Sequence, residues 1–467
     1  ELLALDDAAL RTLQAAPSLA DYDHFLKDLA RRKAHVLDKS GEAVLSLTRA
    51  LAGTPYTILN SLQAETPFPK IQDESGADVQ LGFANFPKYR SHPDRKVRRA
   101  AAKAFFDTLG AFSKSYAASL AAKVKADVYI AQAQGYASAL AASLDSDAVT
   151  RELYDTLLEV THKNLPRTLH RYIKLKKKLL GLDEIHYSDM YTPLFSDVKD
   201  DIAYDEAVQL TLAAMAPMGG EYTGILAKGL DPAARWSDVY PNEGKKSGAY
   251  CTGHWGLHPF VFLNYMDTLD DVFTTAHEFG HAMHFWYSQK TQPYPKSDSP
   301  ILLAEIPSTF QEAMLMDHLI KTSKEKRKTM ALLVKQLENI RLTVIRQVMF
   351  AEFEMLIHAE VEKGGALTAS RLSEIYADLV KRYFGPDFTF DEHDQYEWAY
   401  IPHFYYDFYV YKYATGLMAA FAFSEKILGG DEDARDRFID FLKSGGRDYP
   451  LALLKTAGVD ITDPETM

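Results

Sequence analysis

Residues 275–284 constrain this chain more than any other stretch. They read Thr-Ala-His-Glu-Phe-Gly-His-Ala-Met-His. Positions i and i+4 of an α-helix lie one turn apart on the same face, so His277 and His281 would point toward one site. Two such imidazoles can bind one metal ion, and the neighbouring Glu278 can take a proton from a water molecule without being a ligand. The stretch predicts a metal-binding helix that carries its own general base.

Two further patterns support a helix here. Thr268 followed by Asp271 resembles a capping box, which satisfies the first backbone N–H groups of a helix. Apolar residues then recur every three or four positions, as expected for one buried face: Leu269, Val272, Phe273, Ala276, Phe279, Met283 and Trp286. The motif alone leaves a second interpretation open, in which both histidines are merely hydrogen-bonded on the flank of a core helix.

Glu305 is the candidate third ligand, 24 residues after His281. A zinc hydrolase of the two-His, one-Glu type takes a carboxylate from another element and leaves the fourth position to water. Glu305 is flanked by apolar residues, and an unpaired buried carboxylate is costly, so a partner is expected. Glu312, seven residues later on nearly the same helical face, could accept a hydrogen bond from a ligand histidine. An ordinary surface acid is the alternative for Glu312.

The motif residues resemble a known family. His-Glu-Phe-Gly-His-Ala-Met-His at 277–284, followed by Ala-Glu-Ile-Pro-Ser-Thr-Phe-Gln-Glu at 304–312, resembles the thimet oligopeptidase family of zinc metallopeptidases. The Glu-Ile-Pro-Ser-Thr form is most similar to the oligopeptidase F branch. The resemblance extends to Gly-Ala-Tyr at 248–250 and Ile-Pro-His at 401–403. It also implies that a further N-terminal segment precedes these helices, so we expect a fragment or a trimmed form.

An aromatic window at 398–416 is the candidate source of oxyanion contacts. It holds six tyrosines and one histidine. Phenol or imidazole groups aimed at the metal could donate hydrogen bonds to the oxyanion of the scissile carbonyl. The resemblance implies this role for a histidine and two tyrosines: His403 matches directly, and Tyr406 and Tyr413, expected on one helical face, match best. Tyr409 is the next candidate, and the other tyrosines are interpreted as packing residues.

Two short strands are expected before the metal-binding helix, at 247–252 and 261–265. They would form a small sheet beside it. An edge strand in such a sheet can pair with an extended peptide backbone whatever its side chains are. Gly248, Ala249 and Tyr250 are therefore the candidate substrate-binding residues, although an ordinary hairpin is an equally good interpretation of the pattern.

The fold class predicted is mainly α, with two helical lobes around a deep cleft. Residues 1–185 form a helical lobe, and residues 186–467 form a catalytic region with the small sheet, the metal-binding helix and C-terminal helices. The helical patterns lie at 6–15, 18–37, 41–51, 95–130, 150–180, 326–362 and 368–383. A hydrophobic content of 47% over 467 residues is enough for a large core.

Charge and cysteine content narrow the partners and the compartment. A net charge of −12 argues against nucleic acid and anionic membranes, which attract basic surfaces. A single cysteine, Cys251, allows no internal disulfide and fits a reducing compartment, so we expect a cytoplasmic protein. No stretch approaches the roughly 20 apolar residues of a membrane span.

The function predicted is that of a zinc-dependent oligopeptidase with one Zn²⁺ per chain. Short unfolded peptides are the substrates that the family's enclosed channel implies. A zinc carboxypeptidase is the alternative among enzymes, since it could use the same site. A peptide-binding scaffold without turnover is the alternative outside enzymes, and the retained Glu278 argues against it.

Overall fold

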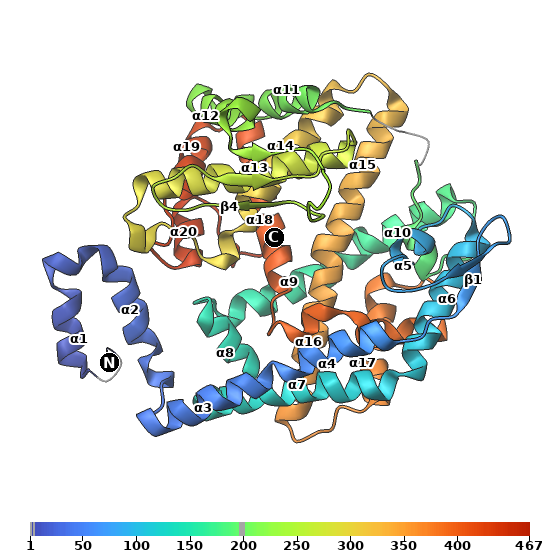
Figure 1. Cartoon of the computed structure of the whole chain (residues 1–467), viewed down its shortest axis with the longest axis horizontal. Helices are drawn as coiled ribbons and strands as arrows, with labels where there is room; N and C mark the ends of the chain where they lie inside the picture. Colours follow the sequence, from blue (N-terminus) through green and yellow to red (C-terminus); the bar gives the residue numbers. More distant parts are fainter. Residues whose placement is uncertain (1, 3–4, 196–200) are drawn as a thin grey trace.

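The structure is a computed structural model that describes residues 2, 5–195 and 201–467. It is mainly helical, as predicted (Figure 1). The first part contains α1 Asp7–Gln14, α2 Asp23–Arg32, α3 Lys39–Ala52, α4 Thr54–Glu65, β1 Lys70–Gln72, β2 Asp78–Gln80, α5 Phe86–Arg90, α6 Arg95–Ala111, α7 Ser113–Ala133, α8 Ala139–Ser146, α9 Arg151–Asn164 and α10 Leu169–Leu179.

The second part contains α13, which is the metal-binding helix. Its elements are α11 Tyr204–Ala214, α12 Gly220–Leu230, β3 Ser237–Asp238, β4 Tyr250–Thr252, β5 Phe260–Phe262, α13 Leu269–Thr291, α14 Glu305–Thr322, α15 Lys326–Ile340, α16 Arg346–Glu362, α17 Ala369–Phe384, α18 Tyr411–Leu428, α19 Glu432–Leu442 and α20 Pro450–Thr456.

Two predicted helices in the first part are interrupted, and one short hairpin was not predicted. The helix expected at 95–130 is two helices, because α6 ends at Ala111 and α7 starts at Ser113, with Phe112 between them. The pattern at 150–180 is interrupted at 165–167, where Pro166 removes a backbone N–H from the ladder. Residues 70–80 form a β-hairpin that the helical prediction missed, closed by a turn with Gly76 at φ +82°.

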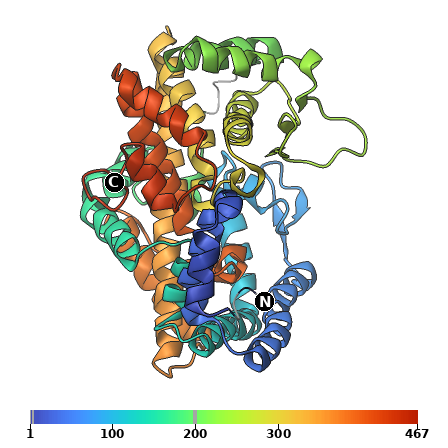
Figure 2. The ribbon, with the colours of Figure 1, turned by 90° about the vertical axis from the view of Figure 1, so that its left-hand side faces the viewer.

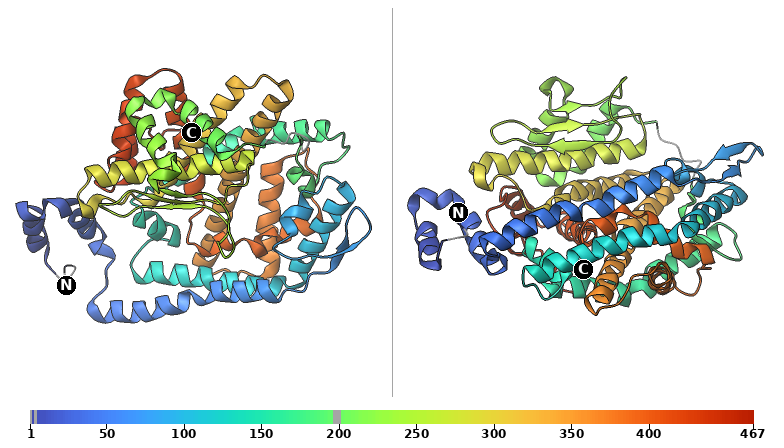
Figure 3. Two further views of the ribbon diagram at one scale, coloured as in Figure 1. Left: turned by 45° about the horizontal axis from the view of Figure 1, so that its top comes forward. Right: turned by 60° about the horizontal axis from the view of Figure 1, so that its bottom comes forward.

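The predicted small sheet is present and shorter than expected. Its strand order is β3-β5-β4, with β4 antiparallel to β5 and β3 parallel to it. Both β4 and β5 pack against α13. In Figure 3 the strands run alongside α13, and in Figure 2 the same helix is seen nearly end-on beside them. Because β5 is central, β4 is an edge strand.

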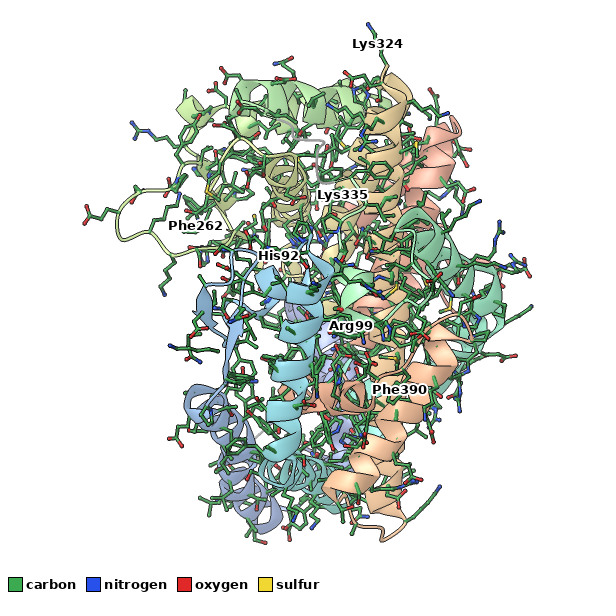
Figure 4. The ribbon with its side chains drawn as sticks, turned by 90° about the vertical axis from the view of Figure 1, so that its right-hand side faces the viewer. His92, Arg99, Phe262, Lys324, Lys335 and Phe390 are labelled. Atoms are coloured by element: carbon green, nitrogen blue, oxygen red, sulfur yellow. The ribbon has the colours of Figure 1, made fainter. Side chains whose placement is uncertain are left out.

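Three helices build the layer that holds the site. α13 packs against α14, and α14 packs against α18 (Figure 1). α15 continues into α16 through a π-helical turn at 341–345, so residues 326–362 form the single long helix that the periodicity predicts. Lys335 of α15 (labelled in Figure 4) pairs with Asp270 at the start of α13, which joins this long helix to the metal-binding helix.

Helices from both ends of the chain share one core. α7 packs against α16 and α17, and α6 packs against the 3₁₀ segment Glu392–Tyr400. Their buried apolar side chains belong to one continuous cluster. The lobe boundary near residue 185 and the deep cleft stay predictions. Within the described residues, none of the helices combines the length and the hydropathy needed to cross a bilayer.

Candidate metal centre and active site

The capping box predicted for α13 is formed. The Thr268 hydroxyl accepts a hydrogen bond from the Asp271 N–H at 3.2 Å, and the Asp271 carboxylate accepts one from the Thr268 N–H at 3.0 Å. The cap sets where the helix begins. It therefore also sets which face carries His277 and His281, two turns further on.

Gly280 allows α13 and α14 to approach each other closely. A Cβ atom at this position would lie 2.4 Å from the carbonyl oxygen of Pro307 and 2.5 Å from the Cα of Ser308, both in the first turn of α14. Only a residue without a side chain fits there. The close approach brings Glu305, the first residue of α14, to the face that carries the two histidines.

Three donor atoms converge at this crossing. His277 Nε2 lies 3.3 Å from Glu305 Oε2, His281 Nε2 lies 3.5 Å from the same oxygen, and the two Nε2 atoms are 3.2 Å apart. In a tetrahedral zinc site with ligand distances of about 2.0–2.1 Å, donor atoms are separated by about 3.3–3.5 Å. The donor set and its spacing therefore fit a zinc ion.

Glu312 determines which nitrogen of His277 is free. Its carboxylate accepts a 2.5 Å hydrogen bond from His277 Nδ1. A neutral His277 then directs its Nε2 lone pair toward Glu305 and His281, as a metal ligand must. Burial opposes a charge on this ring, but the hydrogen bonds to Glu305 and Glu312 outweigh it and raise the pKa of His277 to about 10. Without a metal ion, the His277 ring therefore carries a positive charge at neutral pH, and the same two carboxylates would favour a bound cation.

The other two donors are electron-pair donors at neutral pH. Burial, and then the charge on His277, lower the pKa of His281 to about 4, and the backbone of Ala304 accepts a hydrogen bond from its ring. For Glu305, burial is outweighed by the hydrogen bond with His277 and the charges of both rings, which lower its pKa to about 2. His281 is neutral, and a metal ion would displace the second proton of His277; two imidazoles and one carboxylate then form a donor set typical of zinc.

Glu278 lies next to the donor set without belonging to it. It lies one residue after His277 and is buried, and burial raises the pKa of its carboxyl to about 7. A base whose pKa lies near neutrality can both accept and release a proton. Its charge, after burial, also raises the pKa of Cys251 in β4, so the edge strand lies beside Glu278.

Tyr409 and Tyr413 lie close to the proposed metal ligands. Burial raises the pKa of both phenols, that of Tyr413 to about 12, and the Glu305 carboxylate adds to both shifts. The two rings pack with centroids 5.3 Å apart. α18 packs against α14 here, and Gly416 of α18 faces Glu305, where an added Cβ would make an ordinary contact of 3.7 Å with the glutamate Cβ.

His403 and Tyr406 form the next group. The His403 ring lies 5.6 Å from the Tyr406 ring and 5.9 Å from the Tyr413 ring. Tyr406 is 41% exposed, and its hydroxyl lies 2.9 Å from that of Tyr56 in α4. The expectation that Tyr406 and Tyr413 share a helical face is wrong, because α18 begins only at Tyr411 and the chain before it makes a left-handed turn.

The candidate substrate strand lies at the sheet edge. Tyr250 begins β4, is 56% exposed and stacks on Phe262 of β5 (labelled in Figure 4) with centroids 4.9 Å apart. Gly248 and Ala249 precede the strand and line a cavity of about 490 Å³ beside the first turns of α13. The Asn264 amide donates to the Gly248 carbonyl at 2.8 Å and holds this approach in place.

Comparison with known sequences gives two matches to family models. Residues 88–467 match the model described as peptidase family M3, and residues 1–66 match the model described as oligopeptidase F. The chain belongs to peptidase family M3. The resemblance inferred from the motif residues is thereby confirmed.

Curated relatives and solved structures cover the whole of this M3 peptidase. Oligopeptidase PepF of Bacillus subtilis is 40% identical, over 100% of this chain and 69% of its own length. Group B oligopeptidase PepB of Streptococcus agalactiae is 37% identical, over 100% and 77%.

Among solved structures, a Chlamydophila abortus protein described as a candidate peptidase has a TM-score of 0.94 at 37% identity. It covers 100% of this chain and 78% of its own. The oligoendopeptidase-F of Enterococcus faecium has a TM-score of 0.82 at 32% identity, with the same coverage. These likenesses support a peptidase function on a mainly helical fold.

Sequence reasoning missed two contributors to the site of this M3 peptidase. Gly280 lets α14, which holds Glu305, approach α13, and Tyr56 contacts Tyr406 from far along the chain. A glycine inside a helical pattern is itself a signal of close packing, and it could have identified Gly280. No local pattern marks Tyr56.

Proposed function

We propose that this M3 peptidase is a zinc-dependent endopeptidase acting on short unfolded peptides. The observation that carries the proposal is the tetrahedral spacing of three donor atoms beside a buried carboxyl group with a pKa near 7. His277, His281 and Glu305 would hold one Zn²⁺, and Glu312 would orient the first of them.

The metal and the base have separate tasks. When bound, zinc would lower the pKa of a water molecule to about 7 and polarise the peptide carbonyl. Glu278 accepts the proton of the attacking water and passes it to the leaving amine. Its burial keeps the carboxyl ready for both transfers, because neither protonation state is strongly favoured at neutral pH.

Phenol and imidazole groups stabilise the oxyanion. Tyr409 and Tyr413 are the first candidates because both interact electrostatically with Glu305, and His403 packs beside Tyr413 and Tyr406. A donor of this kind contributes roughly 3 kcal/mol where it has been measured. High phenol pKa values keep these groups protonated, so that they can donate at neutral pH.

The edge strand supports recognition of extended peptides. β4 has an unpaired edge, lies beside Glu278 and begins with the exposed Tyr250. A substrate backbone can pair with that edge without a particular sequence. The names of the relatives, oligopeptidase and oligoendopeptidase, support short substrates and internal cleavage. The single cysteine supports action in the cytoplasm.

The test combines metal analysis with peptides whose two ends are blocked. We expect one zinc per chain, internal cleavage of blocked, internally quenched peptides, and loss of cleavage after chelation. Glu278→Gln should keep its zinc and lose at least about 10³-fold in kcat, because only the base is removed.

Three outcomes would count against the proposal. Cleavage restricted to peptides with a free C-terminus would favour the carboxypeptidase alternative. Binding of peptides without turnover would favour the scaffold. Full activity of Glu278→Gln would remove the assigned base.

A further inference from the structure

The turn at residues 406–409 has an unusual backbone. Asp407 has φ +56° and Phe408 has φ +58°, and among the described residues these are the only two adjacent non-glycine residues in the left-handed region. Asp tolerates this conformation, but a bulky aromatic residue does so only at an energetic cost. Such a conformation persists where surrounding contacts enforce it.

Two buried side chains from separate helices hold the turn. Glu354 of α16 is completely buried and accepts a 3.1 Å hydrogen bond from the Phe408 N–H. Ser143 of α8 donates a 2.7 Å hydrogen bond to the Asp407 carbonyl. The Phe408 ring is also completely buried and lies 4.4 Å, between centroids, from the ring of His358, one turn after Glu354. The strained residues are therefore fixed from both sides.

Glu354 is a costly way to satisfy one backbone N–H. Its second oxygen, Oε2, is buried without a hydrogen-bond partner. Burial raises the pKa of this carboxyl well above its usual range. A buried polar atom without a partner destabilises the fold, so packing alone does not account for a glutamate here.

The turn separates the two groups of aromatic residues at the site. Before it, Tyr406 packs on His403 and bonds to Tyr56; after it, Tyr409 packs on Tyr413 and interacts with Glu305. A regular helix through this turn could not present the two groups in this way, because Tyr406 and Tyr409 would follow one helical surface.

We propose that Glu354 is a positioning residue for catalysis. By holding the Phe408 N–H it locks the left-handed turn, and the turn places the phenols of Tyr406 and Tyr409 for oxyanion contacts. Within the described part of the chain, the Phe408 N–H is the hydrogen-bond partner of the Glu354 carboxylate, and this carboxylate has no hydrogen bond to the proposed metal ligands. The inference rests on the proposed peptidase mechanism and adds to it the element that aligns the hydroxyl donors.

The test compares two substitutions of similar size. Glu354→Gln keeps an acceptor for the Phe408 N–H, whereas Glu354→Met removes it. We expect Glu354→Met to lower kcat by about tenfold or more with KM within about threefold, because oxyanion donors act mainly in the transition state. Zinc content should not change, and Glu354→Gln should retain most of the activity.

A second readout does not depend on turnover. Hydrogen–deuterium exchange of the peptide that contains Phe408 should accelerate in Glu354→Met and stay slow in Glu354→Gln. Ser143→Ala removes the other anchor of the turn and should also accelerate exchange of the peptide that contains Phe408. This variant replaces Glu354→Met if Glu354→Met does not fold.

Glu352→Met is the matched control. Glu352 is a buried carboxylate on the same helix, pairs with His162 and Arg382, and has no hydrogen bond to the 406–409 turn. Its loss should lower the melting temperature and leave the kcat of the folded enzyme and the exchange of Phe408 unchanged.

Two results would overturn the inference: wild-type kcat in Glu354→Met, or equal losses in Glu354→Met and Glu354→Gln. If the wild-type enzyme cleaves no blocked peptide, the proposed function fails instead. The exchange measurement then decides about the turn separately, and unchanged exchange in Glu354→Met would overturn the anchoring role as well.

Discussion

The two ring nitrogens of His277 have separate partners, one that orients the ring and one in the proposed metal site. Nδ1 is held by Glu312 at 2.5 Å, which leaves Nε2 to face Glu305 and His281. A carboxylate on the outer nitrogen fixes both the tautomer and the orientation of the ring. Glu312 therefore belongs to the site although it lies outside the donor set, and the alternative of an ordinary surface acid does not account for its contact.

Replacing Glu312 tests this orientation. Glu312→Ala should weaken zinc binding by about 10–100-fold, because the His277 ring loses its hydrogen-bond acceptor. The measurement is competition with a chelating dye. Glu312→Gln should weaken binding less, since an amide oxygen can still accept from Nδ1. An unchanged zinc affinity in Glu312→Ala would show that the ring is held by packing alone.

The raised pKa of Glu278 makes a prediction about stability. Its folded-state pKa of about 7 exceeds the ordinary 4.5, so the folded protein binds more protons between these values. The contribution of this carboxyl to stability is fully present below pH 4.5 and is lost as pH rises through about 7.

Glu278→Gln removes this titration. In chelated protein, the variant should gain roughly 1–3 kcal/mol in free energy of unfolding relative to wild type between about pH 5 and about pH 8. Urea unfolding at both pH values measures the difference. A gap that stays constant with pH would mean that Glu278 titrates as it does in the unfolded chain.

Among helices, the crossing of α13 and α14 decides whether the site exists. The two histidines lie on one helix and Glu305 on the next, and Gly280 sets the distance between them. A Cβ atom added at position 280 would lie 2.4 Å from the carbonyl oxygen of Pro307. That oxygen belongs to the backbone, which cannot move aside as a flexible side chain can. On the proposed zinc site, helix packing therefore controls metal binding.

Gly280→Ala should separate the two helices. Over-packing of this kind costs about 1–3 kcal/mol, and we expect a lower melting temperature together with weaker zinc binding. Gly224→Ala is the matched control: Gly224 lies inside α12 with open space around its missing Cβ. There alanine should stabilise the protein slightly, because it is the better helix former. Normal zinc affinity in Gly280→Ala would contradict the role of the crossing.

In the whole molecule, contacts over long stretches of sequence complete the site. Tyr56 of α4 reaches Tyr406 across 350 positions, and Ser143 and Glu354 hold the following turn from two further helices. These segments share one continuous apolar core. The catalytic arrangement proposed here thus requires the first part of the chain as well as the region around α13.

Tyr56→Phe isolates one of these contacts. The substitution removes a single hydroxyl from a partly exposed pair, so stability should change by less than about 1 kcal/mol. We expect kcat to fall by about three- to tenfold, because Tyr406 loses the partner that orients its hydroxyl. Steady-state kinetics measure this. Tyr129→Phe, at an exposed position of α7, is the control and should leave kcat unchanged.

The residues that carry the proposed chemistry could be read from the order of amino acids alone. His277, Glu278 and His281 could be placed because the α-helix has a fixed period, and Glu305 because a carboxylate must complete such a donor set. Which tyrosines approach Glu305 became clear only from the folded chain. The backbone reverses at Asp407 and Phe408 in a left-handed conformation, and that conformation is imposed by Glu354 and Ser143, which no local pattern connects to it.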